Sequence, residues 1–294
     1  MMKRLCVALV ILFLVGLLGL AQQFPVTVVD DRGVEITIEQ EPERIIVAGI
    51  SLYTDILIDL GALDRLVAVA SSPDNPPEVA GLPRVGESFA ANVEVILSLD
   101  PDLVLGASDW AGERTKLEEL GITVLTVGRL GGYIPTIPDI FSSITTIGTA
   151  VGAKAKAKLL IGQIAEEIII IESTTLTEPP VKAAFLYATT RDTPPYAAGS
   201  SSIENELMVR AGGENVFSDV QGFPQVSFEE ILSRDPDVIF TDPAQVVNIL
   251  ENPLLREVSA VASKKVYGIN ASHLLSTKVA RALRIMSEFL HPQE

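Results

Sequence analysis

The sequence contains one cysteine, Cys6, and two histidines, His273 and His291. Because Cys6 lies in the first 21 residues, which we expect to be removed, the mature chain has no thiol. Disulfide bonds, thiolate catalysis and cysteine metal sites are therefore excluded. The chain also lacks a Gly-x-Ser-x-Gly turn, a phosphate-binding loop and a His-carboxylate cluster suited to metal-dependent hydrolysis. These absences argue against an enzyme.

Basic residues are also scarce, at 22 against 38 acidic residues, for a net charge of −16. Removal of Lys3 and Arg4 with the first 21 residues leaves 20 basic residues and a net charge of −18. Such a charge disfavours nucleic acid and anionic membrane surfaces as partners. It suits a soluble exported protein that meets a basic partner.

The N-terminal segment, residues 1–21, is typical of a secretory signal peptide. Lys3 and Arg4 precede an apolar run from Leu5 to Leu20, and Gly19-Leu20-Ala21 provides a cleavage site. An uncleaved membrane anchor is the alternative, but the run is short for a bilayer span. Cys6 precedes the apolar run, so it is not placed for lipid attachment to a mature N-terminus. We expect a periplasmic location without a lipid anchor.

One segment occurs twice, at residues 92–105 and 227–240, with a constant offset of 135. Both copies have a capping residue, a glutamate two positions later, Ile-Leu-Ser, Asp-Pro-Asp and three apolar residues. Such a repeat indicates two similar lobes. Strand and helix patterns alternate on both sides of residues 135–175, which favours two α/β lobes with parallel sheets flanked by helices. The expected domains are residues 22–134 and 176–294.

Residues 135–175 have apolar side chains at helical spacing, so we expect a single long helix that joins the lobes. The alternative is two helices broken near Gly148 to Gly152.

The mature chain resembles the periplasmic substrate-binding proteins of ABC importers for iron-siderophores, heme and cobalamin. The resemblance rests on the order and spacing of several short segments, which are 44–62, 82–86, 93–104, 196–199, 211–216 and 229–239. It implies two α/β lobes joined by one long helix, and a metal-chelate ligand held between them. A ferric siderophore is the first expectation, with cobalamin or heme as alternatives. No intrinsic cofactor and no metal bound by the protein itself are expected.

Ligands of parallel α/β sheets bind beyond the carboxyl ends of the strands. Two arginines in loops at these ends would suit an anionic chelate, and aromatic side chains would supply flat apolar area. His273 is a further candidate, as a heme ligand. Each has a structural alternative, since a loop arginine is often solvated or paired, here with Asp192, and a loop aromatic is often part of the core. The expected ligand-binding residues are Tyr53, Phe89, Trp110, Arg129, Tyr133, Arg191, Tyr196, Phe223 and His273.

Glu94 and Glu229 occupy equivalent positions in the two copies of the repeat. Each helix leads into a parallel strand, so its N-terminus lies at the edge where the strands end. The structural alternative is a carboxylate that only stabilises the helix dipole. The resemblance implies a further role, because the family uses one such glutamate per lobe to dock on the permease.

The sequence therefore predicts a solute-binding protein that is monomeric and delivers its ligand to an ABC permease dimer. An exported α/β hydrolase and a ligand sensor without transport are the competing hypotheses.

Overall fold

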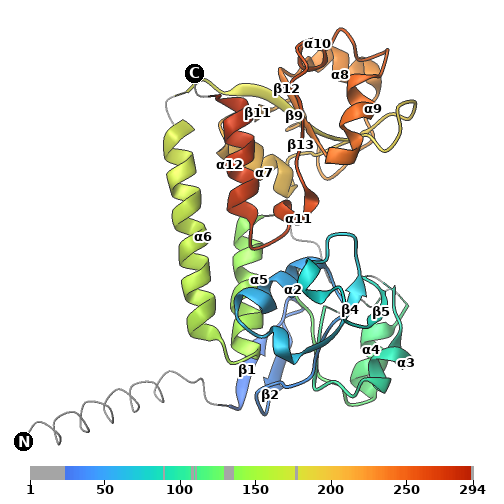
Figure 1. The fold of residues 1–294 in the computed structure, drawn as a ribbon, viewed down its shortest axis with the longest axis vertical. Helices are drawn as coiled ribbons and strands as arrows, with labels where there is room; N and C mark the ends of the chain where they lie inside the picture. The colour runs from blue at the N-terminus through green and yellow to red at the C-terminus, as the bar shows by residue number, and fades with distance from the viewer. Residues whose placement is uncertain are drawn as a thin grey trace, which may run out of the picture. The chain divides into compact units, whose positions relative to one another are not determined.

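The computed structural model describes residues 24–88, 90–106, 109, 111–128, 136–175 and 178–292, so the expected signal peptide lies outside it. Two compact units form. The first comprises the chain through Ser72, Pro76–Gly132 and Ser142–Ile161, and the second comprises Pro73–Asn75, Tyr133–Phe141 and Gly162–Glu294. Each unit contains a mostly parallel sheet with helices (Figure 1). The predicted α/β class with two lobes is confirmed.

The sheet of the first unit has the strand order β6-β5-β4-β3-β7-β8, in which β6 alone is antiparallel to its neighbour. The neighbouring strands β3 and β7 are short apolar runs with every side chain buried, as expected of strands covered on both faces. A separate hairpin, β1-β2, precedes it. The elements are β1 (Val26–Val29), β2 (Glu35–Ile38), β3 (Ile45–Val47), α2 (Ser51–Asp59), η1 (Leu63–Arg65), β4 (Leu66–Ser71), η2 (Pro77–Val79), β5 (Arg84–Glu87), β6 (Ala90–Ala91), α3 (Val93–Ser98), β7 (Leu103–Leu105), α4 (Glu113–Glu119) and β8 (Val124–Leu125).

In the second unit β9 is central, with β12 and then β13 on one side. On its other side β11 pairs in parallel with the first half of β9, and β10 pairs antiparallel with the end. The elements are β9 (Val181–Tyr187), β10 (Tyr196–Ala197), α7 (Ile203–Arg210), β11 (Gly213–Asn215), α8 (Phe228–Arg234), β12 (Val238–Thr241), η3 (Pro243–Gln245), α9 (Val246–Leu250), α10 (Ser259–Ala262), β13 (Val266–Gly268), α11 (Ala271–Leu274) and α12 (Val279–Leu290).

The expected single helix over residues 135–175 is wrong, and its alternative of two helices is confirmed. The segment forms α5 (Ile137–Ala150) and α6 (Lys154–Thr175). Gly152, at φ +75°, ends α5, because the amides of Gly152 and Ala153 bond back to the carbonyls of Thr149 and Gly148. This is the glycine-terminated arrangement that commonly closes helices. Both helices are divided between the units, because the chain changes unit after Phe141 in α5 and again after Ile161 in α6.

No helix in the portion of the chain that the structure describes is long and apolar enough to cross a membrane.

The repeat is confirmed as a structural unit, since α3 leads into β7 and α8 leads into β12 at the same offset. The predicted caps are both present. The Asn92 side chain accepts a hydrogen bond from the Val95 amide, and the Ser227 side chain accepts one from the Glu230 amide, each at 3.1 Å. Asp100 and Asp235, the first residues of the two Asp-Pro-Asp turns, adopt left-handed conformations at φ 46° and 43°.

Candidate functional site

Each unit has a point where the chain reverses the direction in which it adds strands to the sheet. In the first unit this point lies between β3 and β7, and in the second it lies between β9 and β12. Side chains just beyond the carboxyl ends of these strand pairs are the first candidates for a ligand site, because the crevice of an open α/β sheet forms there.

Tyr53 fills this point in the first unit. Gly49 and Gly106 follow β3 and β7, and a Cβ on either would lie 2.5 Å from Cε2 of the Tyr53 ring. The ring has no exposed surface, and its hydroxyl donates to the Val127 carbonyl oxygen. Burial also raises the pKa of the phenol. Tyr53 therefore belongs to the core in this structure, and we do not retain it as a ligand contact.

Tyr187 occupies the equivalent point in the second unit, as the last residue of β9. Its ring lies edge-on to Phe223, with centroids 5.9 Å apart, and also contacts Phe185 at 5.0 Å. Its hydroxyl donates to Glu204 Oε1 at 2.5 Å. Phe223, which the sequence predicts as a ligand contact, is 39% exposed. The pair therefore presents aromatic surface at the expected edge of the sheet.

The surroundings of Tyr187 are acidic. Glu204 is 4% exposed, and burial raises the pKa of its carboxyl more than the hydrogen bond from Tyr187 lowers it. Burial and then the charge of Asp242 raise the pKa of Asp74, whose short segment groups with the second unit. The pKa of the Tyr187 phenol is raised by burial, by Glu204 and by both aspartates. Asp242 thus places negative charge at this edge, which disfavours a polyanion, whereas burial favours the neutral forms of Glu204 and Asp74.

Tyr187, Glu204 and Asp242 were not among the predicted ligand residues. Tyr187 is the terminal residue of β9, and residues at the carboxyl ends of parallel strands are the ones that the topology marks as ligand candidates. Glu204 offered no sequence signal for a role at this site, since a glutamate in the first turn of a helix is ordinarily solvated and faces the helix dipole.

Arg191 and Tyr196 are both exposed. The Arg191 guanidinium pairs with Glu251 at 2.6 Å, with side chains 48% and 57% exposed. The expected alternative partner was the adjacent Asp192, but the structure shows a partner 60 residues away. Tyr196 is 47% exposed in β10, where its backbone bridges Gln225. Tyr196 thus remains accessible, while Arg191 already has an anionic partner.

His273 is partly buried in α11. Burial, followed by the charges of Arg281 and Lys278, lowers the pKa of its imidazole below the usual 6.5. The ring is therefore neutral at pH 7. Its Nδ1 has no hydrogen-bond partner among the described residues. That nitrogen is itself buried, so in this structure His273 does not offer it to a ligand from solvent.

Four of the predicted ligand residues, Phe89, Trp110, Arg129 and Tyr133, lie outside the described residues. Those that are described form no group of three histidine, cysteine or carboxylate side chains able to hold a metal ion.

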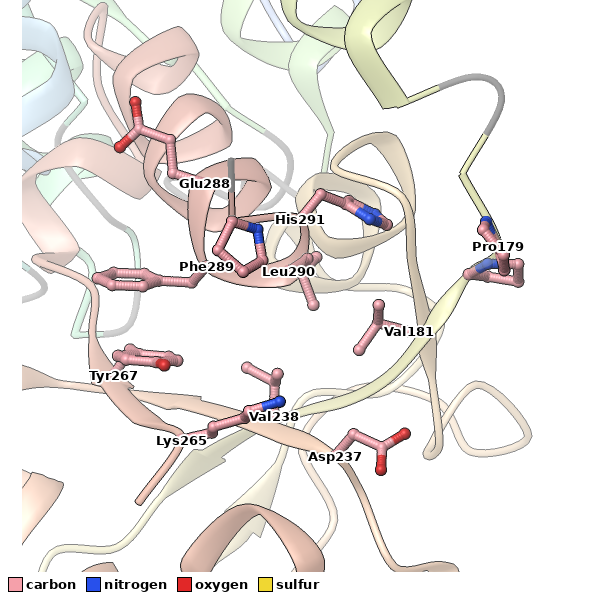
Figure 2. Close-up of a pocket in the computed structure, with 12 residues that line it drawn as sticks. Pro179, Val181, Asp237, Val238, Lys265, Tyr267, Glu288, Phe289, Leu290 and His291 are labelled. Carbon is pink, nitrogen blue, oxygen red and sulfur yellow. The ribbon is translucent and has the colours of Figure 1, made fainter. Parts of the chain in front are cut away.

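A groove of about 480 Å³ opens at the opposite, N-terminal end of the second sheet. Val181 and Val238, the first residues of β9 and β12, line it, together with Tyr267 and Phe289, whose rings stack 3.8 Å apart (Figure 2). This location is the wrong end of the strands for the crevice that the topology predicts.

Glu94 and Glu229 lie in the first turns of α3 and α8, and both are exposed. The described contacts include no ion pair for either residue, whereas the adjacent Glu230 pairs with Arg234. Two equivalent carboxylates are thus available to an external partner.

The residues from 46 to 272 match the model of the periplasmic binding protein family. The chain belongs to the periplasmic binding protein family. The match spans both units and includes the repeat.

Relatives agree with this assignment. An uncharacterized ABC transporter substrate-binding lipoprotein of Bacillus subtilis is 30% identical over 254 residues, 84% of this chain and 79% of its own length. A cobalamin-binding protein of Halobacterium salinarum is 27% identical over 267 residues, 86% and 70% of the two chains. Members of the family are substrate-binding proteins, so the expectation that the chain is not an enzyme is confirmed.

The solved structure of an ABC-type Fe³⁺-hydroxamate transport system from Saccharomonospora viridis is 27% identical, with a TM-score of 0.75, covering 92% of this chain and all of that one. A heme-binding protein from Roseiflexus has the same fold, with a TM-score of 0.74 at 23% identity over 85% of this chain and 98% of its own. The chain is therefore a solute-binding protein of the ABC importer type.

Proposed function

We propose that this chain captures a metal-chelate ligand outside the cytoplasm and delivers it to the permease of an ABC importer. The exposed aromatic surface of Phe223 and Tyr196, beside the strand-order reversal of the second sheet, is the observation that carries the proposal. Flat apolar side chains at such a point suit a large ring-containing ligand. The signal-like N-terminus supports export.

The ligand in this proposal is a chelate of low net charge, with a corrinoid as the first choice. The charge of Asp242 near Tyr187 and the net charge of −16 disfavour a polyanion such as a catecholate siderophore. Arg191, which was expected to bind an anionic ligand, instead forms an ion pair with Glu251. A corrinoid offers a broad ring edged by neutral amides. Several relatives at 27–28% identity are named as cobalamin-binding or vitamin B12-binding proteins.

A ferric hydroxamate is the second candidate, because such chelates also lack a large negative charge. The 27%-identical structure named as an Fe³⁺-hydroxamate transport system supports it. We rank a catecholate and heme below both, since their ionised groups would face the charge of Asp242 near Tyr187.

Calorimetry of the full chain with cyanocobalamin, ferrichrome and hemin in separate titrations tests the ligand class. We expect cyanocobalamin to bind most tightly, and Phe223→Ala to weaken its binding about tenfold through the loss of aromatic contact. Phe289→Ala, which alters the stacked pair at the far groove, is the matched control and should leave affinity unchanged. Absence of binding to all three chelates would overturn the proposal.

For docking, we propose that Glu94 and Glu229 insert into basic pockets on the permease. Their equivalent positions, their exposure and the acidic net charge support this role. The double variant Glu94→Ala, Glu229→Ala should retain ligand affinity and abolish uptake into proteoliposomes that contain the permease. Glu119→Ala, Glu214→Ala removes the same charge from other exposed positions and should transport normally. Ligand binding without uptake by the wild-type chain would instead favour a sensor.

A further inference from the structure

Helix α8 is tied to the preceding loop by one arginine. Arg234, in its last turn, donates from Nη1 to Asp219 Oδ1 at 2.6 Å and from Nη2 to Asp219 Oδ2 at 3.0 Å. It also donates to Glu230 Oε1 at 2.9 Å and to the Val216 carbonyl oxygen at 2.5 Å. Such a forked pair with a carboxylate fixes both direction and distance. The loop that contains Val216 and Asp219 and the helix α8 thus meet at one guanidinium, and we call this set of Arg234 contacts the clamp.

The guanidinium also rests on the core. Its Cζ lies 4.7 Å from the centroid of the Phe217 ring, which has no exposed surface. Stacking on an aromatic face favours the cation and restricts its rotamers. The hydrogen bonds from Arg234 lower the pKa of the Asp219 carboxyl, so the pair is ionised at neutral pH. The clamp is therefore a fixed feature of the second unit.

The clamp closes a loop that contains two functional positions. Asp219 and Arg234 are 15 residues apart, and Phe223 and Glu229 lie between them. Phe223 packs on Tyr187 at the ligand edge. Glu229 lies in the first turn of α8, where we place the docking contact. The same loop is also bonded to the segment after β10. The Ser200 amide donates to the Val220 carbonyl oxygen, and the Gly199 amide donates to the Gly222 carbonyl oxygen.

The first unit lacks this clamp. At the repeat offset of 135, Leu99 corresponds to Arg234 and Val95 to Glu230. An apolar pair cannot form the equivalent bridge, so any coupling by this route belongs to the second unit alone.

We propose that Arg234 is a positioning residue that couples the ligand edge at Phe223 to the docking helix that carries Glu229. Ligand contact at Phe223 restricts the motion of the loop between Asp219 and Arg234. Because Arg234 is bonded to Asp219, the motion of α8 is restricted as well. The inference rests on the proposed function for the roles of Phe223 and Glu229, while the clamp itself is independent of it.

Hydrogen exchange of backbone amides tests the clamp first without ligand. We expect Arg234→Met and Asp219→Asn each to speed exchange about tenfold in both residues 216–223 and α8, and the double variant to add no further increase. Asp219 is 62% exposed in its side chain, so Asp219→Asn tests the bridge even if Arg234→Met folds poorly. Arg256→Met is the control, since the Arg256 side chain is 77% exposed and pairs with the neighbouring Glu257. Faster exchange in only one of the two segments would overturn the clamp.

The second arm adds cyanocobalamin or ferrichrome, whichever binds the wild-type chain. Bound chelate should slow exchange in residues 216–223 and in α8 of the wild type, but only in residues 216–223 of the two single variants. Equal slowing of α8 in the variants would overturn the coupling. If neither chelate binds the wild type, the proposed ligand class is wrong. The experiment without ligand still decides whether residues 216–223 and α8 are coupled through the clamp.

Discussion

At the scale of single residues, Glu204 is a carboxyl group that the fold buries almost completely, with 4% of the residue exposed. Its folded pKa is raised above the ordinary 4.5 because the carboxyl is buried. A group with a raised folded pKa contributes its full stability below the unfolded pKa and loses it as pH rises through the folded pKa. The protonated form is thus the one that suits the fold.

Replacement of Glu204 by Gln should therefore remove a pH-dependent penalty. We expect the free energy of unfolding of Glu204→Gln, relative to wild type, to increase as pH rises from about 4 to about 8. Urea denaturation followed by circular dichroism at several pH values measures this difference. Glu214→Gln, at an exposed position in β11, is the control and should show a constant difference. A constant difference for Glu204→Gln as well would mean that this carboxyl ionises normally.

Tyr53 provides a second residue-level prediction. Tyr53→Phe removes the hydroxyl that satisfies the buried Val127 carbonyl oxygen, so we expect a loss of about 1–3 kcal/mol in the free energy of unfolding. Affinity for the chelate should not change, because the ring has no exposed surface. Denaturant titration and calorimetry on the same preparations separate the two effects. A large loss of affinity at unchanged stability would restore Tyr53 to the ligand site.

At the scale of helices, the break between α5 and α6 depends on two glycines with different functions. Gly152 supplies the left-handed residue that closes α5. Gly148 instead permits close packing, since a Cβ there would collide with Cβ of Ala157 in α6. Apolar periodicity continues through both helices, which is why the pattern alone favours one long helix. Two glycines four residues apart were the signal for a turn.

Gly148→Ala should therefore destabilise the protein although alanine is the better helix former. We expect a loss of about 1–3 kcal/mol from overpacking against Ala157. Gly162→Ala in α6 is the matched control, because no atom lies within 4 Å of its added Cβ, and it should stabilise the chain or leave it unchanged. Thermal unfolding of the two variants compares them directly. Equal stability would show that the two helices separate at little cost.

At the scale of the whole molecule, the chain carries a net charge of −16, which we expect to influence its association with a basic partner. If Glu94 and Glu229 dock on basic pockets, the association rate with the permease should fall at least tenfold as ionic strength rises from about 0.05 M to about 0.5 M. Affinity for a near-neutral chelate should change little over the same range. Interferometry with the permease in nanodiscs and calorimetry with cyanocobalamin measure the two responses. A docking rate insensitive to salt would argue against an electrostatic contact.

The mature chain is expected to be monomeric, and light scattering during size-exclusion chromatography checks this. A stable dimer would require a self-complementary surface on each copy. A mass twice that of one chain, at concentrations near those used for docking, would contradict the expectation.

The fold was largely predictable because it rests on patterns that are local in the sequence. Short buried strands, capping residues and the repeat at offset 135 together specify two α/β lobes. The site was less predictable, because orientation and pairing depend on distant residues. Tyr53 and Phe223 both follow glycines in the sequence, yet only the structure shows that Tyr53 turns inward over Gly49 and Gly106. Likewise, nothing local links Arg191 to Glu251.

The left-handed aspartates at positions 100 and 235 have a wider consequence. Both lobes use the same strained turn between helix and strand, although its side chains bond differently, with Asp235 accepting from Ser259. The two copies of the repeat can thus be compared position by position within one chain. Positions that agree at this offset mark the shared framework, and positions that differ, such as Leu99 and Arg234, mark what one half acquired or lost after duplication. Exchange of the two segments within one gene would then reveal how far the lobes have diverged in function.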